Sequence, residues 1–103
     1  MACSSKEIVE QLEYFMDQHG RLGMRVFSFY SDWYVGISQD ADRRLREHNA
    51  LDVPHKVMTA TSAEMARAVE HYFRLRGCYV GPGGGTNPNK VYAYRMKEGT
   101  TRP

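Results

Sequence analysis

Four side chains of this sequence combine the residue types that phosphodiester hydrolysis needs. They are Tyr34 in a β-rich run, Arg44 and His48 four positions apart, and Glu70 in a later segment rich in helix formers. A phenol or an imidazole can position or deprotonate water, a guanidinium can stabilise charge that develops on a phosphate, and a carboxylate can hold a divalent cation. The set therefore indicates chemistry on a phosphate ester.

The spacing of these residues permits a shared site. Arg44 and His48 project from one face of a predicted helix because they are i,i+4 neighbours, and only a short strand-to-helix turn separates them from Tyr34. A phenol with its ordinary pKa near 10 is a poor base at neutral pH, but an arginine and a metal beside it make the phenolate accessible. Glu70 offers the hard oxygen ligand that Mg²⁺ prefers, with phosphate oxygens and water as the other ligands.

Each residue also has a purely structural interpretation. A tyrosine beside a strand glycine, as at Tyr34, is usually packing, and Arg44 belongs to the charged run DRRLRE, which is typical of a solvated face. His48 suits a helix C-terminus, and Glu70 can pair with an arginine three or four positions away along its helix. Taken singly, these interpretations are preferred. The four residues in this order favour the shared site.

Length and composition indicate one globular domain over residues 1–103, with 42% hydrophobic and 25% charged residues. No apolar run approaches the length of a membrane span, and the charged N-terminal segment lacks the apolar core of a secretory signal. Cys3 and Cys78 are not part of a CxxC motif, and with four scattered histidines they make a poor zinc set. We therefore expect a cytoplasmic protein with free thiols and no membrane partner.

The charge balance is less informative than the kind of cation. A net charge of +2 is too small to indicate nucleic-acid binding by itself. Ten of the fourteen basic residues are arginine, the side chain that contacts phosphate in a bidentate fork. This composition is compatible with a phosphate-binding surface.

Hydrophobic spacing and turn residues predict alternating helices and strands. In the first half of the chain we expect a helix over 5–20, two strands joined by a tight hairpin at Ser31-Asp32, and a helix over 40–49 with Asp40 as N-cap. In the second half we expect a strand over 56–61, a helix that begins at a Thr61/Glu64 capping box and ends at Arg76, and a final strand over 91–96. Such an order predicts an α+β fold, with a small, mainly antiparallel sheet flanked by helices.

Residues 33–49, WYVGISQDADRRLREHN, resemble the second signature of the GIY-YIG nuclease domain. In that signature Tyr-[Ile/Val]-Gly is followed by Arg ten residues after the Tyr and by His four residues after the Arg. The matching positions are Tyr34-Val35-Gly36, Arg44 and His48, and the family's later metal-binding glutamate corresponds to Glu70 in ARAVEHYF. The resemblance covers residues 24–96 and leaves a tail over 97–103.

The first signature of that family, Gly-Ile-Tyr on the leading strand, is not recognisable in VFSFY. A two-residue turn would place Phe29 opposite Tyr34, with Phe27 on the same face. Tyr30 would take that place if the turn were longer or bulged. In the family the first tyrosine is a leading candidate for the base that activates water, so its absence leaves catalysis open.

The resemblance implies an endonuclease that depends on Mg²⁺ or Mn²⁺. Glu70 would hold the metal, Arg44 would stabilise the phosphate, and Tyr34 with His48 would position or deprotonate water. The alternative is a catalytically inactive module of nuclease ancestry that binds nucleic acid or a protein partner. We expect the four residues to converge on one concave surface.

Nucleic-acid contacts are expected from basic and amide side chains near the site, namely Arg43, Arg46, Asn87, Asn89 and Lys90. Either asparagine also suits the position before the last strand where many family members carry one. DNA is favoured over RNA as the partner, and the chain is expected to be a monomer or a homodimer. Two tyrosines of the last strand, Tyr92 and Tyr94, share one strand face, where core packing is the preferred interpretation.

Overall fold

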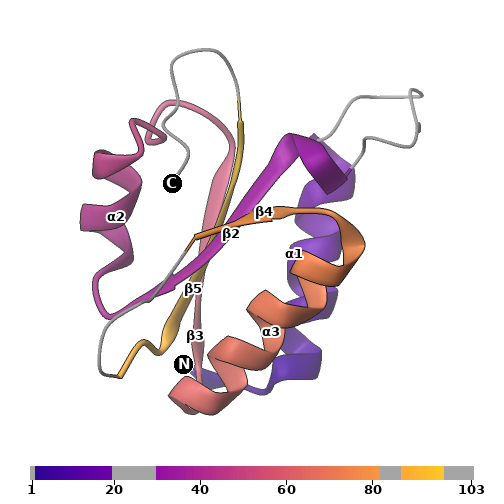
Figure 1. Cartoon of the computed structure of the whole chain (residues 1–103), viewed down its shortest axis with the longest axis vertical. Helices are drawn as coiled ribbons and strands as arrows, with labels where there is room; N and C mark the ends of the chain where they lie inside the picture. Colours follow the sequence, from indigo (N-terminus) through magenta and orange to yellow (C-terminus); the bar gives the residue numbers. More distant parts are fainter. Residues whose placement is uncertain (1, 20–29, 82–86, 97–103) are drawn as a thin grey trace.

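A mixed five-stranded sheet with helices on both faces is the framework of the computed structural model (Figure 1). The structure describes residues 2–19, 30–81 and 87–96. The strands lie in the order β1 (Ala2–Cys3), β3 (His55–Ala60), β5 (Lys90–Arg95), β2 (Trp33–Ser38) and β4 (Tyr79–Val80). The α+β class is confirmed. The sheet is mixed rather than mainly antiparallel, because β1–β3 and β2–β4 are short parallel pairs beside two antiparallel ones.

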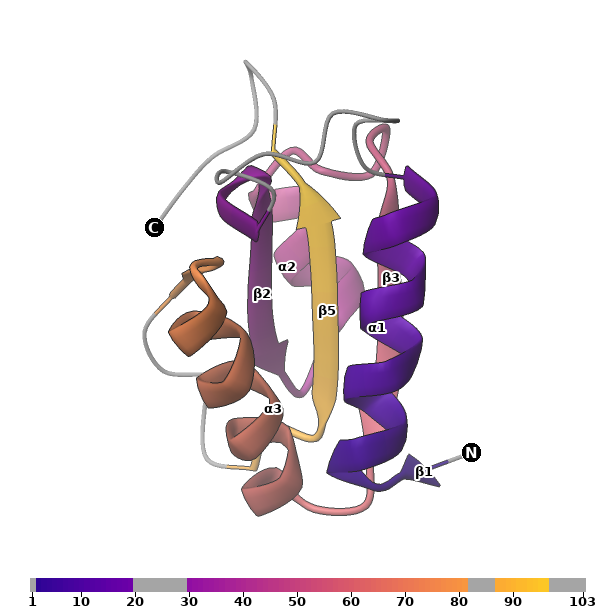
Figure 2. The ribbon, with the colours of Figure 1, turned by 90° about the vertical axis from the view of Figure 1, so that its right-hand side faces the viewer.

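Helices α1 (Ser5–His19) and α3 (Ala63–Arg76) cover one face of the sheet, and α2 (Ala41–Glu47) covers the other (Figures 1 and 2). Successive strand residues point to opposite faces, so the core is divided into two clusters. The cluster beneath α1 and α3 is apolar and includes Trp33, Val35, Ile37, Val69, Phe73, Val91 and Ala93. The cluster beneath α2 contains three tyrosines together with aliphatic side chains: Tyr34, Tyr92, Tyr94, Ala41, Leu45, Ala50 and Val53.

The tight turn predicted at Ser31-Asp32 is wrong, and the leading strand of the predicted hairpin lies outside the described residues. Residues Tyr30–Asp32 form a 3-10 turn, and the strand partners of Tyr34 are Tyr94 on β5 and Tyr79 on β4. Both edges of β2 are occupied at Tyr34, because β5 pairs with one edge and β4 pairs with the other. Phe27 and Phe29 lie outside the described residues, but the place opposite Tyr34 predicted for Phe29 is taken.

Tyr30 does not supply a hydroxyl beside Tyr34. Its hydroxyl donates to Glu13 of α1, at 3.0 Å from Oε1, and the hydroxyl of Tyr72 on α3 donates to Oε2 of the same carboxylate at 3.0 Å. Desolvation by burial and the Glu13 carboxylate raise the pKa of Tyr30 to about 12. One carboxylate therefore joins α1, the 3-10 turn and α3 on the face of the sheet opposite α2.

The helix predictions are confirmed within one or two residues. Asp40 caps α2 by accepting from the backbone N–H of Arg43 at 3.1 Å. Helix α3 is capped by Ser62 rather than by the predicted Thr61, because the Ser62 hydroxyl accepts from the backbone N–H of Met65 at 3.1 Å. Gly77 ends α3 with a φ of 113°, a left-handed conformation that favours glycine.

Composition led us to expect no membrane span and free thiols, and both expectations concern residues that the structure describes. None of the helices that it describes is long and apolar enough to cross a membrane. Cys3 and Cys78, which are both described, form no disulfide bond. Desolvation by burial, followed by the charge of Glu13, raises the pKa of the Cys78 thiol to about 12, so this thiol is held in its neutral form.

The N-cap of α3 is tested by removing two neighbouring hydroxyls separately. Ser62→Ala is expected to lower the free energy of unfolding by about 1 kcal/mol, because the cap accepts one of the helix's first backbone N–H groups. Thr61→Ala is the matched control and is expected to cost clearly less. Urea denaturation of both variants measures the difference. Equal losses, or a larger loss in Thr61→Ala, would contradict the Ser62 cap.

Candidate functional site

Strand β2 and helix α2 bring Tyr34, Arg44 and His48 together. Tyr34 is the second residue of β2, on the α2 face, and His48 is the C-cap of α2, with its backbone N–H 2.9 Å from the carbonyl oxygen of Arg44. The ring centroids of Tyr34 and His48 are 4.7 Å apart. Tyr34 is 1% exposed and His48 is 5% exposed. The local motif therefore forms one buried contact.

Tyr92 is a fifth member of this site, and the sequence analysis assigned it to the core. In the antiparallel register it lies directly opposite Gly36. A Cβ atom at Gly36 would be 2.5 Å from both the Cζ atom and the hydroxyl oxygen of Tyr92. The phenol thus lies against the bare backbone of β2, which explains why glycine follows Tyr34-Val35.

The hydroxyl of Tyr92 connects two of the predicted site residues. It is hydrogen-bonded to Tyr34, and its oxygen is 3.4 Å from Nε2 of His48. Tyr94 stacks on Tyr34 with centroids 5.0 Å apart, while the Tyr92 and Tyr34 rings are 6.1 Å apart. The predicted packing of both tyrosines is confirmed, since Tyr92 and Tyr94 are buried. Their alternation in VYAYR was the available signal, but the partner strand could not be inferred from it.

The electrostatic environment keeps both phenols protonated. Desolvation by burial raises the pKa of Tyr34, and Glu70 adds to that rise, whereas the hydrogen bond from Tyr92 and the charge of Arg44 lower it. Desolvation also raises the pKa of Tyr92, with a further contribution from Tyr34, and Arg44 again opposes the shift. Arg44 therefore favours an anionic oxygen at this position.

Arg44 is held at the edge of the site in a partly desolvated position. Its side chain is 28% exposed, and its Nε lies 3.4 Å from Oε1 of Glu47. Nε is buried and makes no hydrogen bond to the part of the chain that the structure describes. Arg43 lies 3.7 Å from the other oxygen of Glu47 and is mostly exposed. The predicted solvated face of α2 is thus confirmed for Arg43, while Arg44 is directed partly inward.

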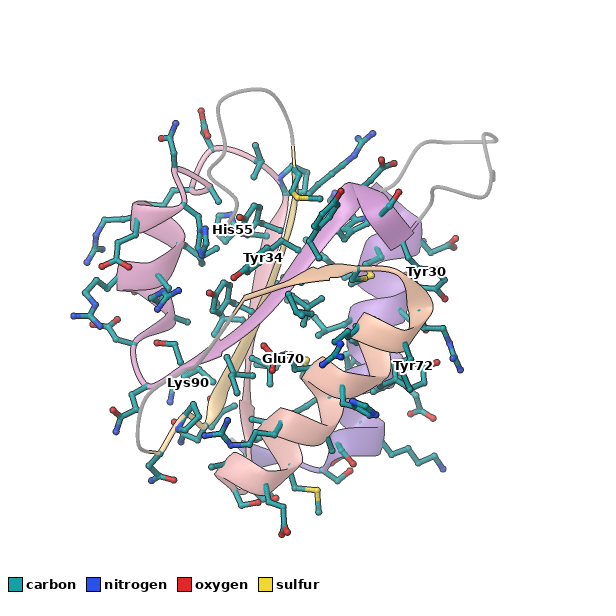
Figure 3. The ribbon with its side chains drawn as sticks, viewed as in Figure 1. Tyr30, Tyr34, His55, Glu70, Tyr72 and Lys90 are labelled. Carbon is teal, nitrogen blue, oxygen red and sulfur yellow. The ribbon has the colours of Figure 1, made fainter. Side chains whose placement is uncertain are left out.

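Glu70 approaches Tyr34 from α3, which covers the other face of the sheet. Figure 3 shows its side chain projecting from α3 toward β2 and β5, and its charge raises the pKa of Tyr34. Desolvation by burial raises the pKa of Glu70 itself, and Arg67 and Arg74 oppose that shift. The structure therefore places Glu70 within electrostatic range of the phenol, and the charges of two flanking arginines also act on it.

The predicted nucleic-acid contacts divide into two groups. Arg43 and Arg46 are exposed on α2, and Lys90 lies at the end of the sheet where it pairs with Ser38 (Figure 3). Asn87 is exposed, but Asn89 has a structural task, because its carbonyl oxygen accepts from the backbone N–H of Ala60 at 2.7 Å. The basic residues thus lie on α2 and at the end of β5 that pairs with the last residue of β2.

The predicted concave surface stays a prediction. A groove of about 390 Å³ lies between α1 and α3, where Lys6, Val9 and Tyr72 are among its lining residues, on the face of the sheet opposite Tyr34. Among the described residues, no group of three or more His, Cys, Asp or Glu side chains is placed so that it could hold a metal ion. A cation at Glu70 would thus have one protein carboxylate, a set that Mg²⁺ accepts when phosphate and water complete it.

The raised pKa of Glu70 gives a stability test with a definite sign. A carboxyl group whose pKa is higher in the folded protein costs stability as the pH rises above its ordinary range, about 4. Glu70→Gln should therefore be at least as stable as the wild type at pH 7, and the difference should vanish toward pH 4. Denaturation across this pH range measures it, with Glu64→Gln on the same helix as the exposed control. Marked destabilisation at pH 7 in Glu70→Gln alone would contradict the desolvated carboxylate.

No family model, curated protein or solved structure matches this chain.

Proposed function

We propose that this domain is a GIY-YIG-type endonuclease that cleaves phosphodiester bonds of nucleic acid with Mg²⁺ or Mn²⁺. One arrangement carries the proposal: Tyr34 of β2 is in ring contact with His48 at the end of α2, and the charges of Arg44 on α2 and Glu70 on α3 both act on the pKa of this phenol. A polar arrangement of this kind reduces the apolar packing of the core and has no evident structural benefit. It suits a site where charge develops on a phosphate.

The roles of the residues follow from their positions. The Arg44 guanidinium, partly exposed and opposing the high pKa of both phenols, would bind a phosphate oxygen and stabilise the added charge of the transition state. The Tyr34 hydroxyl would orient the attacking water, with His48 in ring contact behind it. Glu70 would hold the cation, which when bound supplies Lewis-acid charge to the phosphate. Arg43, Arg46 and Lys90 would contact flanking phosphates, with DNA favoured over RNA.

A second candidate function is nucleic-acid or protein binding without cleavage. The observation that favours it is the burial of Tyr34, which is 1% exposed and whose pKa is raised by desolvation. A buried neutral phenol is poorly placed to meet water unless the site opens on substrate binding. The two functions share the basic surface and differ in whether the Tyr34 hydroxyl is needed.

Cleavage of plasmid DNA in the presence of Mg²⁺, Mn²⁺ or EDTA tests the first function. Glu70→Gln should abolish metal-dependent cleavage and leave binding intact or slightly tighter, because the carboxylate recruits the cation but repels phosphate. Arg44→Ala should weaken both binding and cleavage. Tyr34→Phe should lose cleavage with folding unchanged, since only the hydroxyl is removed.

Two exposed residues outside the site serve as controls for these variants. Glu64→Gln removes a carboxylate from α3, and Lys6→Ala removes a cation from α1 on the opposite face of the sheet. Both should cleave as the wild type does. Wild-type cleavage that persists in Glu70→Gln and in Tyr34→Phe would rule out the proposed site. A wild type that binds DNA but cleaves with neither metal would establish the second function.

The salt dependence of binding tests the extent of the basic surface. If Arg43, Arg44, Arg46 and Lys90 each neutralise one phosphate, about four counterions are released from duplex DNA, and the log–log slope of affinity against salt is about −3.6. Fluorescence anisotropy with a labelled duplex measures this slope. Arg46→Ala should reduce its magnitude by about 0.9, whereas Lys6→Ala should leave it unchanged. Undetectable binding to duplex, single-stranded and branched DNA at low salt would favour a protein partner instead.

A further inference from the structure

We infer that Tyr92 and His48 form a proton relay behind Tyr34, so that a proton taken from the attacking water ends on Nε2 of His48. This inference rests on the proposed function, because the relay serves a hydrolytic step. It assigns a role to Tyr92, a residue of the last strand that lies outside the motif of residues 33–49.

The relay follows from three contacts that meet in the cluster beneath α2. The hydroxyl of Tyr92 donates a hydrogen bond to the hydroxyl oxygen of Tyr34. The Tyr92 oxygen is 3.4 Å from Nε2 of His48, and the close approach to Gly36 fixes the phenol in this position. The order Tyr34–Tyr92–His48 leads from β2, where Glu70 acts on the first phenol, to the end of α2. A phenol that served only to fill the core would not need a hydroxyl that lies between the Tyr34 hydroxyl and the His48 imidazole.

Each step of the relay transfers one proton and leaves the charge balanced. Water gives a proton to the Tyr34 oxygen as that hydroxyl gives its own proton to the Tyr92 oxygen, and the Tyr92 hydroxyl gives its proton to Nε2 of His48. The resulting hydroxide forms the new bond to phosphorus, and the bond from phosphorus to the leaving oxygen breaks. The leaving oxygen takes a proton from solvent, and the relay later returns its proton to solvent by the reverse path.

The relay explains how a site with two buried, protonated phenols could accept a proton from water. Burial raises the pKa of both phenols, so neither is readily available as a phenolate at neutral pH. Histidine is the side chain that normally changes its charge in this pH range. If the proton passes through the phenols and is stored on the imidazole, neither tyrosine has to become an anion. In the resting site Tyr92 donates to Tyr34. The relay requires both hydroxyl hydrogens to rotate, so that Tyr34 donates to Tyr92 and Tyr92 donates to Nε2 of His48, and hydroxyl groups permit such rotation.

The groups that face His48 come from three elements. Tyr34 of β2 is in ring contact with it at 4.7 Å, and Tyr92 and Tyr94 of β5 have ring centroids at 6.1 Å and 5.3 Å. Arg44 of α2 is one turn away and contributes positive charge that acts on both Tyr34 and Tyr92.

The chain provides a matched control for Tyr92. Tyr94 lies on the same strand and the same face, is buried, and packs on both Tyr34 and His48. Both Tyr92→Phe and Tyr94→Phe remove one hydroxyl and keep the ring. The relay runs through Tyr92 alone, so only Tyr92→Phe should affect it.

Two measurements test the relay, and the first does not depend on activity. Nitrogen-15 NMR of the full-length protein reports which imidazole nitrogen of neutral His48 carries the proton, and the relay requires Nε2 to be the bare nitrogen. Selective carbon-13 labelling of tyrosine reports the pKa of Tyr34, which should rise by about half a unit or more in Tyr92→Phe, because the phenolate loses its donor. Tyr94→Phe should leave this pKa and the protonation of the imidazole unchanged. A proton on Nε2 in the wild type, or equal effects of the two variants, would overturn the relay.

The second measurement is the rate of plasmid cleavage with Mg²⁺. Tyr92→Phe should lower kcat by about 100-fold, the low end of what a positioned proton acceptor contributes, with little change in KM. Tyr94→Phe should stay within a few-fold of the wild type. Full activity in Tyr92→Phe would overturn the relay even where Tyr34→Phe is inactive. Absence of cleavage by the wild type would overturn the proposed function instead, so the two failures are distinguishable.

Discussion

The contact between the Tyr92 phenol and the backbone of Gly36 is the constraint on which the rest of the structure depends. At 2.5 Å from a hypothetical Cβ, the ring leaves no room for any side chain at position 36. The contact fixes β5 on β2 with Tyr92 opposite Gly36 and Tyr94 opposite Tyr34. A slip of one residue would turn the tyrosines of either strand toward the apolar α1/α3 cluster. Register, core composition and the position of the phenols are therefore determined together.

The two faces of the sheet have different tasks. The face beneath α1 and α3 is closely packed with aliphatic and aromatic side chains, and a shared carboxylate at Glu13 joins its elements. The face beneath α2 contains hydroxyls, the buried His48 and the partly buried Arg44. Helix α2 has seven residues, too few for a stable helix by itself, so its place depends on the buried Leu45 and on the tyrosine rings. The apolar cluster beneath α1 and α3 thus stabilises the sheet on which the polar arrangement beneath α2 is built.

The sequence was sufficient for the elements that depend on local patterns. Helix α1, the Asp40 cap of α2 and the end of α3 at Gly77 were predicted because spacing and capping residues determine them. The tight turn at Ser31-Asp32 was predicted wrongly because the strand partners of Tyr34, which are Tyr79 on β4 and Tyr94 on β5, lie far away in the sequence and cannot be inferred from the turn residues. The short strands β1 and β4, two residues each, carry no periodic signal and were not predicted.

The same distinction explains which site residues were found from the sequence. Arg44 and His48 belong to a single helix, and their distance from Tyr34 is set by a short turn, so their proximity followed from spacing. Tyr92 is 58 positions after Tyr34. Nothing in VYAYR indicates that the Tyr92 ring lies against Gly36 and that its hydroxyl contacts Tyr34 and His48. The hydroxyl that was sought in the segment before Tyr34 is instead present on the final strand, beside Tyr34 and His48.

Glu70 acts on a phenol that faces the other side of the sheet, in a strand that the short β4 borders only in part. Strand β4 pairs with Tyr34 and Val35 only, so the outer edge of β2 from Gly36 to Ser38 has no strand partner among the described residues. Helix α3 packs along this side of β2, and Glu70 projects from it toward the sheet (Figure 3). The α3 carboxylate and the α2 arginine thus act on the Tyr34 hydroxyl from opposite faces of the sheet. Because the carboxylate raises the pKa of this phenol and the guanidinium lowers it, the protonation of Tyr34 depends on both layers of helices that cover the sheet.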